Sequence, residues 1–358
     1  MPIVTTEHFK SGCLPFSKDG IPQVSEDDYK RLRGYKLEKD DIVFSRVGSV
    51  DINAHVGDLQ DGWLFSGRVL RVRPIKTINA ECLHYVLSTE LVKRNIRNRA
   101  VGQTMPSINT PILANTKIFL PQSIVEQKKI ATLLRLIDER IATQNKIIED
   151  LKKLKSAISK HLFSRKDLLE TTIRLADIAT LKNGYAFQSS KYDTKGKWKI
   201  LTIANVSGER YINDDDCNCI INLPNDIQDH QVLKEGDILI SLTGNVGRVS
   251  LCKVGNYLLN QRVGLLHITK NVNQEFLYQV LSSRRFENSM VACGQGAAQM
   301  NISKGDVENF VLPYSSNGNS IRMIAGILQS YDVFTINELR ILTLLTMQKQ
   351  YLLHQMFI

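Results

Sequence analysis

The feature that most restricts the fold of this chain is an internal duplication of two long helical patterns, Ser123 to Phe163 and Ser315 to Phe357. In both segments apolar residues recur at alternating spacings of three and four, which predicts a helix with one narrow apolar stripe. The two stripes correspond at a separation of 194 residues, so that Ile130 matches Ile324. The stripes comprise Ile130, Leu134, Ile137, Ile141, Ile148, Leu151, Ile158 and Leu162, and then Ile324, Leu328, Tyr331, Leu342, Leu345, Leu352 and Met356.

A helix with a single narrow stripe buries that stripe well against a second helix of the same kind. Each pattern covers about 40 residues, which corresponds to a helix ~60 Å long. Two unrelated amphipathic helices would not keep register over such a length. We therefore expect the helices to pair as an antiparallel coiled coil through the stripe residues. The alternative is two separate helices that each face the core of a domain.

The segments ahead of the helices also match each other. Leu37–Ser45 aligns with Leu233–Ser241, and Gly48 aligns with Gly244, both at a separation of 196 residues. Each segment reads as a polar turn, a short strand and a glycine-bearing turn. We expect an α+β fold of two mixed α/β domains, each followed by a long helix. The expected boundaries of domain, helix, domain and helix are 1–121, 122–165, 166–313 and 314–358.

The two halves differ at their beginnings. The second half opens with a stretch from Ile173 to Gly184 that precedes Trp198, whereas the first half starts at the counterpart of Trp198. The alignment of the halves leaves about thirty residues without a match at the front of the first domain. The sequence thus predicts a complete second domain and a shortened first one.

Composition favours a polyanionic partner such as nucleic acid. The 358 residues are 43% hydrophobic, enough for two domains with their own cores, and carry a formal net charge of +10 with a pI of about 9.2. The six cysteines are scattered, which indicates free thiols in a reducing cytoplasm. No apolar run approaches the ~20 residues of a membrane helix, so we expect a cytoplasmic protein with no membrane contact.

Motifs for catalysis are absent from the sequence. No glycine-rich phosphate loop and no methyltransferase motif that would hold a flipped base is present, and the histidines and cysteines lack metal-ligand spacing. The glycines of Gly244–Gly247 are too close together for a phosphate loop and predict a tight turn. We therefore expect no enzyme activity, no metal and no cofactor in this chain.

Basic residues next to glycine, glutamine and asparagine loops are the candidates for contact with DNA. Phosphates attract Lys and Arg, whereas Arg, Asn and Gln read base edges in the major groove. A solvated basic face is the alternative for each residue taken alone. The candidates are Arg46, Arg94, Arg97, Arg99, Gln103, Lys182, Arg248, Arg284, Arg285, Gln295 and Asn301.

The start of the first helical segment resembles a known family. Leu120–Ala131, followed by Leu133–Leu134 and Ile137–Asp138, is similar to the "LP, EQ, IA, LD" signature in the specificity subunits of Type I restriction–modification enzymes. The run Gly236–Gly244 resembles the target recognition domains of that family. The resemblance covers essentially the whole chain, but Ser320–Ile321 replaces the EQ pair in the second helix.

This resemblance implies a DNA-reading subunit without chemistry of its own. Each domain would read one half of a bipartite site in double-stranded DNA, and the helix pair would set the spacer between the halves. DNA adenine methyltransferase (modification) subunits and restriction/translocase subunits would be its partners, and any AdoMet would bind to those partners. The alternatives are the recognition polypeptide of a Type IIB-like system, a base-modifying enzyme, and a coiled-coil scaffold with no DNA role.

Overall fold

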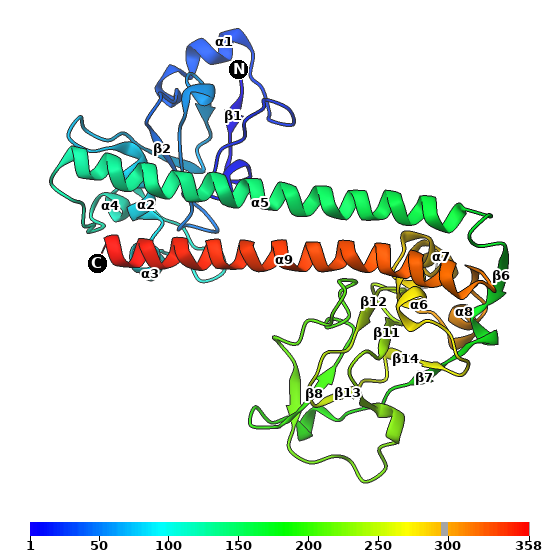
Figure 1. Ribbon diagram of the computed structural model, residues 1–358. Helices are drawn as coiled ribbons and strands as arrows, with labels where there is room; N and C mark the ends of the chain where they lie inside the picture. Colours follow the sequence, from blue (N-terminus) through cyan, green and yellow to red (C-terminus); the bar gives the residue numbers. More distant parts are fainter. Residues whose placement is uncertain (295–299, 358) are drawn as a thin grey trace. The chain divides into compact units, whose positions relative to one another are not determined.

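The computed structural model describes residues 1–294 and 300–357 of the chain (Figure 1). These residues form two compact units. Unit 1 consists of Met1–Asn145 together with Arg340–Ile358, and unit 2 consists of Lys146–Leu339. The mixed α+β class expected from the sequence is confirmed, while the expected domain boundaries stay predictions.

Two helices are much longer than the others. They are α5 (Ile124–Ser164) and α9 (Gly318–Met356), and they cover the two segments with the duplicated stripe. The division between the units falls inside both helices, so each unit contains one segment of α5 and one segment of α9.

Unit 1 contains a three-stranded antiparallel sheet with the strand order β3-β2-β5, and a separate parallel pair of β1 and β4. All four residues of β2 are buried, as expected for its Ile-Val-Phe-Ser sequence. The elements ahead of α5 are β1 (Ile3–Val4), α1 (Glu26–Arg31), β2 (Ile42–Ser45), β3 (Asn53–His55), β4 (Leu64–Phe65), β5 (Val69–Val72), α2 (Ala80–Leu87), α3 (Glu90–Arg99) and α4 (Thr110–Ala114).

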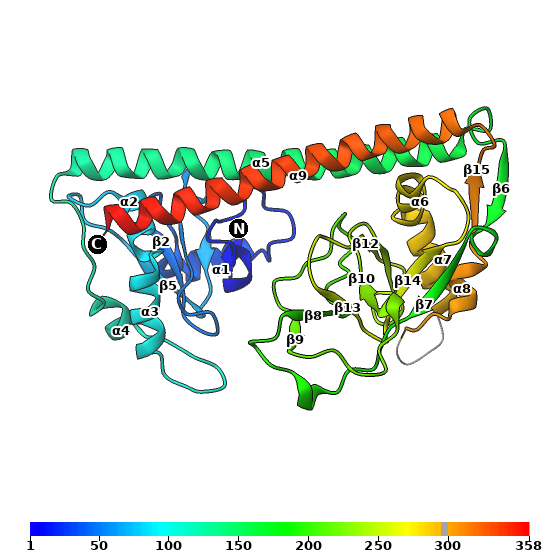
Figure 2. The same cartoon turned by 60° about the horizontal axis from the view of Figure 1, so that its bottom comes forward.

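Unit 2 contains two four-stranded sheets, ordered β10-β13-β8-β9 and β12-β11-β14-β7, and the antiparallel pair β15-β6. The short helices α6, α7 and α8 lie together near β12 and β7 (Figure 2). The elements between α5 and α9 are β6 (Thr171–Arg174), β7 (Ala179–Asn183), β8 (Trp198–Leu201), β9 (Asn218–Ile220), β10 (Val232–Leu233), β11 (Ile238–Ser241), β12 (Val249–Leu251), β13 (Tyr257–Leu259), β14 (Val263–Ile268), α6 (Gln274–Leu281), α7 (Arg284–Gly294), α8 (Lys304–Glu308) and β15 (Val311–Tyr314).

The duplication seen in the sequence is repeated element by element. β2, β5, α2, α3 and α4 of unit 1 correspond in order to β11, β14, α6, α7 and α8 of unit 2. Helices α2 and α6 even start the same way, because the side chains of Asn79 and Asn273 each accept a hydrogen bond from the backbone of the first turn. The strands β6 and β7 have no counterpart in the described part of unit 1, so that β5 forms the edge of its sheet.

Each unit has its own apolar core, and both long helices contribute to each core. In unit 1, Ala131 and Leu134 from α5 join Phe357, which directly follows α9. In unit 2, Leu162 from α5 joins Leu328 from α9. Part of each stripe therefore packs against a domain core, as the alternative interpretation of the stripes expected.

Candidate nucleic-acid interface and helix contacts

The glycine turn of unit 1 is fastened to a second loop. The Gly48 N–H donates to the carbonyl of Pro106 at 2.8 Å, and the Ile108 N–H donates to the carbonyl of Arg46 at 2.9 Å. Gly48 has a φ of 81°, a left-handed conformation that glycine adopts without strain. This turn and the loop before α4 are thereby held side by side, with the side chain of Arg46 exposed.

Unit 2 repeats this arrangement with the corresponding residues. The Gly244 N–H donates to the carbonyl of Met300 at 2.9 Å, and the Ile302 N–H donates to the carbonyl of Leu242 at 2.9 Å. Gly244 also lies in the left-handed region, with a φ of 70°. We call the two fastened loops of each unit its turn–loop pair. The same backbone device thus occurs once in each half of the chain.

The basic candidates on α3 are in three different situations. Arg94 is exposed and has no hydrogen bond or ion pair among the described residues. Arg97 donates to the carboxylates of Asp51 and Glu90, whose hydrogen bonds raise its pKa, so its charge is already balanced. Arg99 donates to a backbone carbonyl, that of Asn115, at 2.9 Å. Arg94 is therefore the best-placed of the three to contact a phosphate.

The loop candidates lie at the turn–loop pairs. Gln103 is exposed in the loop that precedes α4. In unit 2, Asn301 is exposed, and its backbone forms an isolated antiparallel β-bridge with Thr243 in the glycine turn. Arg248 follows that turn, and its Nε lies 3.9 Å from Glu287 of α7. Gln295 lies outside the described residues.

The remaining candidates for contact with DNA in unit 2 differ in their exposure and in their contacts. Arg284 is exposed at the first residue of α7. Arg285 donates weakly to the carbonyl of Val311 at 3.4 Å, and its guanidinium stacks 5.9 Å from the centroid of the Phe310 ring. Lys182 is half-buried on β7, where it lies opposite Leu265 of β14 in the strand register.

A buried ionic cluster joins the two helices and the domain in unit 2. Asp332 of α9 accepts from Lys155 of α5 at 2.5 Å, from Arg210 at 2.9 Å and from Gln279 at 2.7 Å. Arg210 also donates to Glu275 of α6 at 2.6 Å. Burial lowers the pKa of Arg210, but the hydrogen bonds to Glu275 and Tyr211 and the charges of Glu275 and Asp332 together outweigh this and keep the pKa above the ordinary value. The cation is therefore permanently charged and fully partnered.

Unit 1 has the equivalent contact in simpler form. Asp138 of α5 accepts from Lys349 of α9 at 2.5 Å and from the hydroxyl of Tyr85 at 2.9 Å. Asp138 and Lys349 stand 194 residues from Asp332 and Lys155 respectively. Neither of these two ionic pairs was predicted from the sequence. The matched spacing of both residues was the signal that could have revealed them.

The stripe residues are all buried or half-buried. In unit 1 the partners of Leu134 in the core include Leu352 and Met356, and in unit 2 Leu162 shares a core with Ile324. Asp138 of α5 also contacts Lys349 of α9 in unit 1, and Lys155 contacts Asp332 in unit 2, so that within each unit rising numbers on α5 meet falling numbers on α9. The two helix segments run in opposite directions within each unit.

Within residues 1–294 and 300–357, no group of three or more His, Cys, Asp or Glu side chains is placed to hold a metal ion. No helix in this part of the chain is long and apolar enough to cross a membrane.

The family of the chain follows from its match to a family model. The model of the Type I restriction modification DNA specificity domain matches residues 1–153 and again residues 170–347. This covers most of the chain in two copies, in agreement with the duplication. The chain belongs to this family.

Individual relatives agree with that assignment. The MjaVIII specificity subunit of a Type I restriction enzyme from Methanocaldococcus jannaschii is 27% identical over 64% of this chain and 59% of its own length. A specificity subunit named MjaX, from the same organism, is 26% identical over 87% of this chain and 76% of its own length. The chain thus spans less than two thirds of the first relative and about three quarters of the second.

A solved structure supports the fold. The S subunit of a Type I restriction–modification system from M. genitalium has a TM-score of 0.59 with 18% identity, covering 90% of this chain and 84% of that chain. At this level of identity the likeness concerns the fold alone.

Proposed function

We propose that this chain is the DNA-reading subunit of a Type I restriction–modification complex, with one reading surface in each half. The observation that carries the proposal is the turn–loop pair, which occurs twice with the same backbone bonds in corresponding positions. Each copy brings exposed polar or basic side chains, such as Arg46 and Asn301, to a backbone held in a fixed conformation. Two similar readers in one chain suit a DNA site made of two half-sites.

We further propose that α5 and α9 pair along their lengths as an antiparallel coiled coil that sets the spacer between the half-sites. The cross-helix pairs at Asp138 and Asp332 support this, because each holds an α5 segment beside an α9 segment at one register. The partners would be DNA adenine methyltransferase subunits and restriction/translocase subunits. Chemistry, AdoMet and ATP would belong to them, and this chain would contribute recognition.

The phosphate role of α3 can be tested by two substitutions on the same helix. Arg94→Ala removes an unpartnered cation, whereas Arg97→Ala removes one that Asp51 and Glu90 already balance. We expect Arg94→Ala to weaken duplex binding and reduce the slope of log affinity against log salt by ~1. Binding is measured over a salt series with the chain in complex with its modification subunit.

Arg97→Ala is the matched control for that experiment. It should leave the salt slope nearly unchanged, even if unit 1 loses some stability. Equal slopes for the wild type and Arg94→Ala would remove α3 from the interface. A complex that binds no duplex at any salt concentration would favour the scaffold alternative.

The spacer role is tested by lengthening both helices. Four residues are inserted after Asn145 in α5, and four before Arg340 in α9, which adds about one turn to each helix and rotates the stripe beyond each insertion by only ~40°. Methylated adenines are then mapped across a genome that expresses the system. We expect the same half-site bases with a longer spacer, whereas new half-site bases with the old spacer would contradict the proposal.

A Type IIB-like system is the remaining candidate within the same architecture. It differs in that modification and cleavage reside in one partner polypeptide. Purification of the partners from a host that carries the complete locus separates the two: a methyltransferase without nuclease activity supports Type I.

A further inference from the structure

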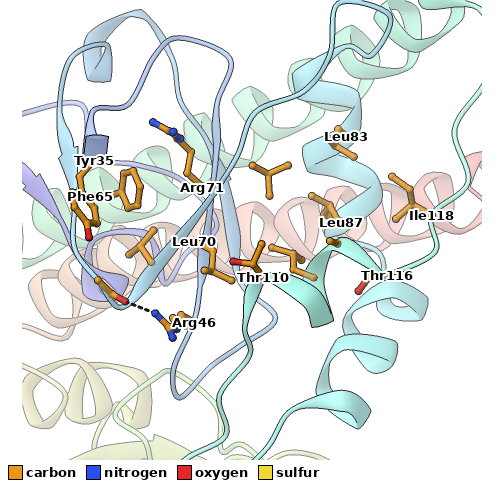
Figure 3. Close-up of a pocket in the computed structure, with 15 residues that line it drawn as sticks. Tyr35, Arg46, Phe65, Leu70, Arg71, Leu83, Leu87, Thr110, Thr116 and Ile118 are labelled. Carbon is orange, nitrogen blue, oxygen red and sulfur yellow. Dashed lines mark hydrogen bonds between the residues drawn. The ribbon is translucent and has the colours of Figure 1, made fainter. Parts of the chain in front are cut away.

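A pocket in unit 1 lies along the open edge of β5. It has a volume of about 580 Å³, and Figure 3 shows Leu70 of β5, Leu83 and Leu87 of α2, and Thr110 of α4 around it. Its lining includes the two cations Arg46 and Arg71 and no Asp or Glu. β5 pairs with β2 on its other side and with no further strand among the described residues. An unpaired edge of this kind is a template for another strand.

Unit 2 shows what occupies the corresponding space. There the counterpart of β5 is β14, which pairs from Gly264 to Ile268 with the antiparallel strand β7. The helix α8, the counterpart of α4, holds that strand through Glu308, which accepts from the hydroxyl of Thr180 at 2.7 Å and from the N–H of Leu181 at 2.9 Å. Leu181 is fully buried. A strand of this chain thus fills the place that is a pocket in unit 1.

The pocket of unit 1 differs from the β7 site in one decisive side chain. Gly264 of β14 is replaced in β5 by Leu70, its counterpart at a separation of 194 residues. A Cβ atom at Gly264 would come within 2.7 Å of a methyl group of Leu181. The Leu70 side chain therefore takes up space that a leucine at the Leu181 position requires. A strand that fits the pocket needs a small residue there.

Charge provides a second requirement. Arg71 is the counterpart of Leu265, which faces Lys182 of β7 in the strand register. The guanidinium of Arg71 donates to the carbonyl of Lys36 at 2.6 Å and lies 5.5 Å from the centroid of the Phe65 ring, but no carboxylate balances it among the described residues. An acidic residue at the Lys182 position would supply that carboxylate.

We propose that the β5 pocket is a strand-acceptor site for an extended acidic peptide segment of a separate polypeptide. The segment adds to the sheet antiparallel to β5, presents a small residue to Leu70 and directs a carboxylate to Arg71. Backbone hydrogen bonds to the strand edge provide affinity, and the two side-chain requirements provide selectivity. The proposal does not rest on the DNA-reading role, although Arg46 lines the pocket and is also a candidate for contact with DNA.

The test uses the full chain and two fluorescent peptides based on residues 171–184. One has the natural sequence and the other carries Leu181→Ala and Lys182→Glu. Binding is measured by fluorescence polarisation. We expect the doubly substituted peptide to bind about tenfold more tightly, because it relieves overpacking against Leu70 and pairs with Arg71. Equal affinity of the two peptides, or no binding of either at millimolar concentration, overturns the proposal.

Two variants of the chain locate the binding at β5. Leu70→Gly restores the space found at Gly264 and should reverse the preference toward Leu at the Leu181 position. Arg71→Ala leaves the apolar pocket intact and should abolish the advantage of Glu over Lys in single-substitution peptides. Unchanged preferences in both folded variants contradict the assigned register.

Self-association is measured in parallel by light scattering. A second copy of the chain could donate its own β6–β7 segment. A dimer of the wild type that Leu70→Gly or Arg71→Ala tightens would overturn the proposal of a separate polypeptide in favour of a second copy, because a second copy brings Leu181 and Lys182 to these two positions. A monomer that binds the acidic peptide supports the proposal.

Discussion

In each unit an aspartate on one long helix connects that helix to the other long helix and to the domain. We call the contacts of this aspartate, Asp138 in unit 1 and Asp332 in unit 2, the joint of the unit, and the two joints differ in burial and in their partners. In unit 2, Asp332 is 9% exposed and receives three donors, one of them the buried guanidinium of Arg210. In unit 1, the Asp138 side chain is 32% exposed and receives Lys349 and Tyr85. The stretch that corresponds to Arg210, Leu14–Phe16, has no basic residue. Both units therefore have the lysine–aspartate pair between the helices, but only unit 2 has a buried arginine at this aspartate.

The lysine–aspartate pair that fixes α5 against α9 is thus the same in both units. The contacts that connect this pair to the domain are different. Lys155 and Lys349 each hold one helix to the other, whereas Arg210 ties the helix to a loop and to α6 of its domain. Removal of an ion-pair partner costs far more free energy of unfolding when the remaining charge is buried than when it is exposed. We therefore expect substitutions at the joint of unit 2 to be more destabilising than substitutions at the joint of unit 1.

The largest expected effect is that of Arg210→Ala. The substitution leaves Asp332 and Glu275 without their main cation in a buried site, and we expect unit 2 to lose ~3–5 kcal/mol of its free energy of unfolding. Unfolding of each unit is followed by one tryptophan, Trp63 in unit 1 and Trp198 in unit 2, with the other replaced by Phe. The Trp63 transition should stay in place.

Lys152→Ala is the control for that substitution. Lys152 pairs with Glu209 in the same unit, but both side chains are about half exposed. Its loss should cost less than ~1 kcal/mol. If Arg210→Ala costs no more than Lys152→Ala, the buried cluster does not distinguish the two joints.

The two long helices and their repetition could be predicted from the sequence, because two stripes with fifteen apolar positions in all and a constant separation leave few alternatives. The α+β class and the corresponding strands at Gly48 and Gly244 followed from the same comparison. The joint could not be predicted, because Arg210 comes from a loop whose counterpart in the first half, Leu14–Phe16, has no basic residue. Nor could the ion pair of Arg97 with Asp51, because Asp51 lies far from Arg97 in the sequence and reaches it only through the fold.

A pH effect confined to unit 1 is expected from His84. Burial, with a smaller contribution from His55, lowers the pKa of His84 from 6.5 to about 3, and its Nδ1 lies 2.7 Å from the Oδ1 of Asn53. Since the unfolded chain takes up this proton near pH 6.5 and the folded chain does not, unit 1 loses stability as the pH falls below 6.5. The loss between pH 7 and pH 5 should be roughly 2 kcal/mol.

The counterpart of His84 is Tyr278, which is buried and does not titrate in this range. Its pKa is raised by burial, away from acidic pH. The Trp63 transition should therefore move more with pH than the Trp198 transition, and His84→Gln should remove most of the excess. Parallel shifts of both transitions, in the wild type and in the variant, would assign the acid sensitivity to other groups.

The smallest effect is expected from exchanging the charges of the cross-helix pairs. In unit 1, Asp138→Lys or Lys349→Asp alone should cost ~1 kcal/mol, and the two together should recover most of it, because this pair is partly exposed. The measurement is a double-mutant cycle on the Trp63 transition.

The same exchange in unit 2, Lys155→Asp together with Asp332→Lys, should recover little. Asp332→Lys places a cation beside Arg210, and the single carboxylate introduced by Lys155→Asp cannot balance both cations from the position of one lysine. A large recovery in unit 1 and a small one in unit 2 would show that the Asp138–Lys349 pair fixes only the register of the helices. The Asp332–Lys155 pair would then also connect the helices to the domain. Equal recovery in both units would mean that Arg210 is held by Glu275 and that Asp332 serves only the helix pair.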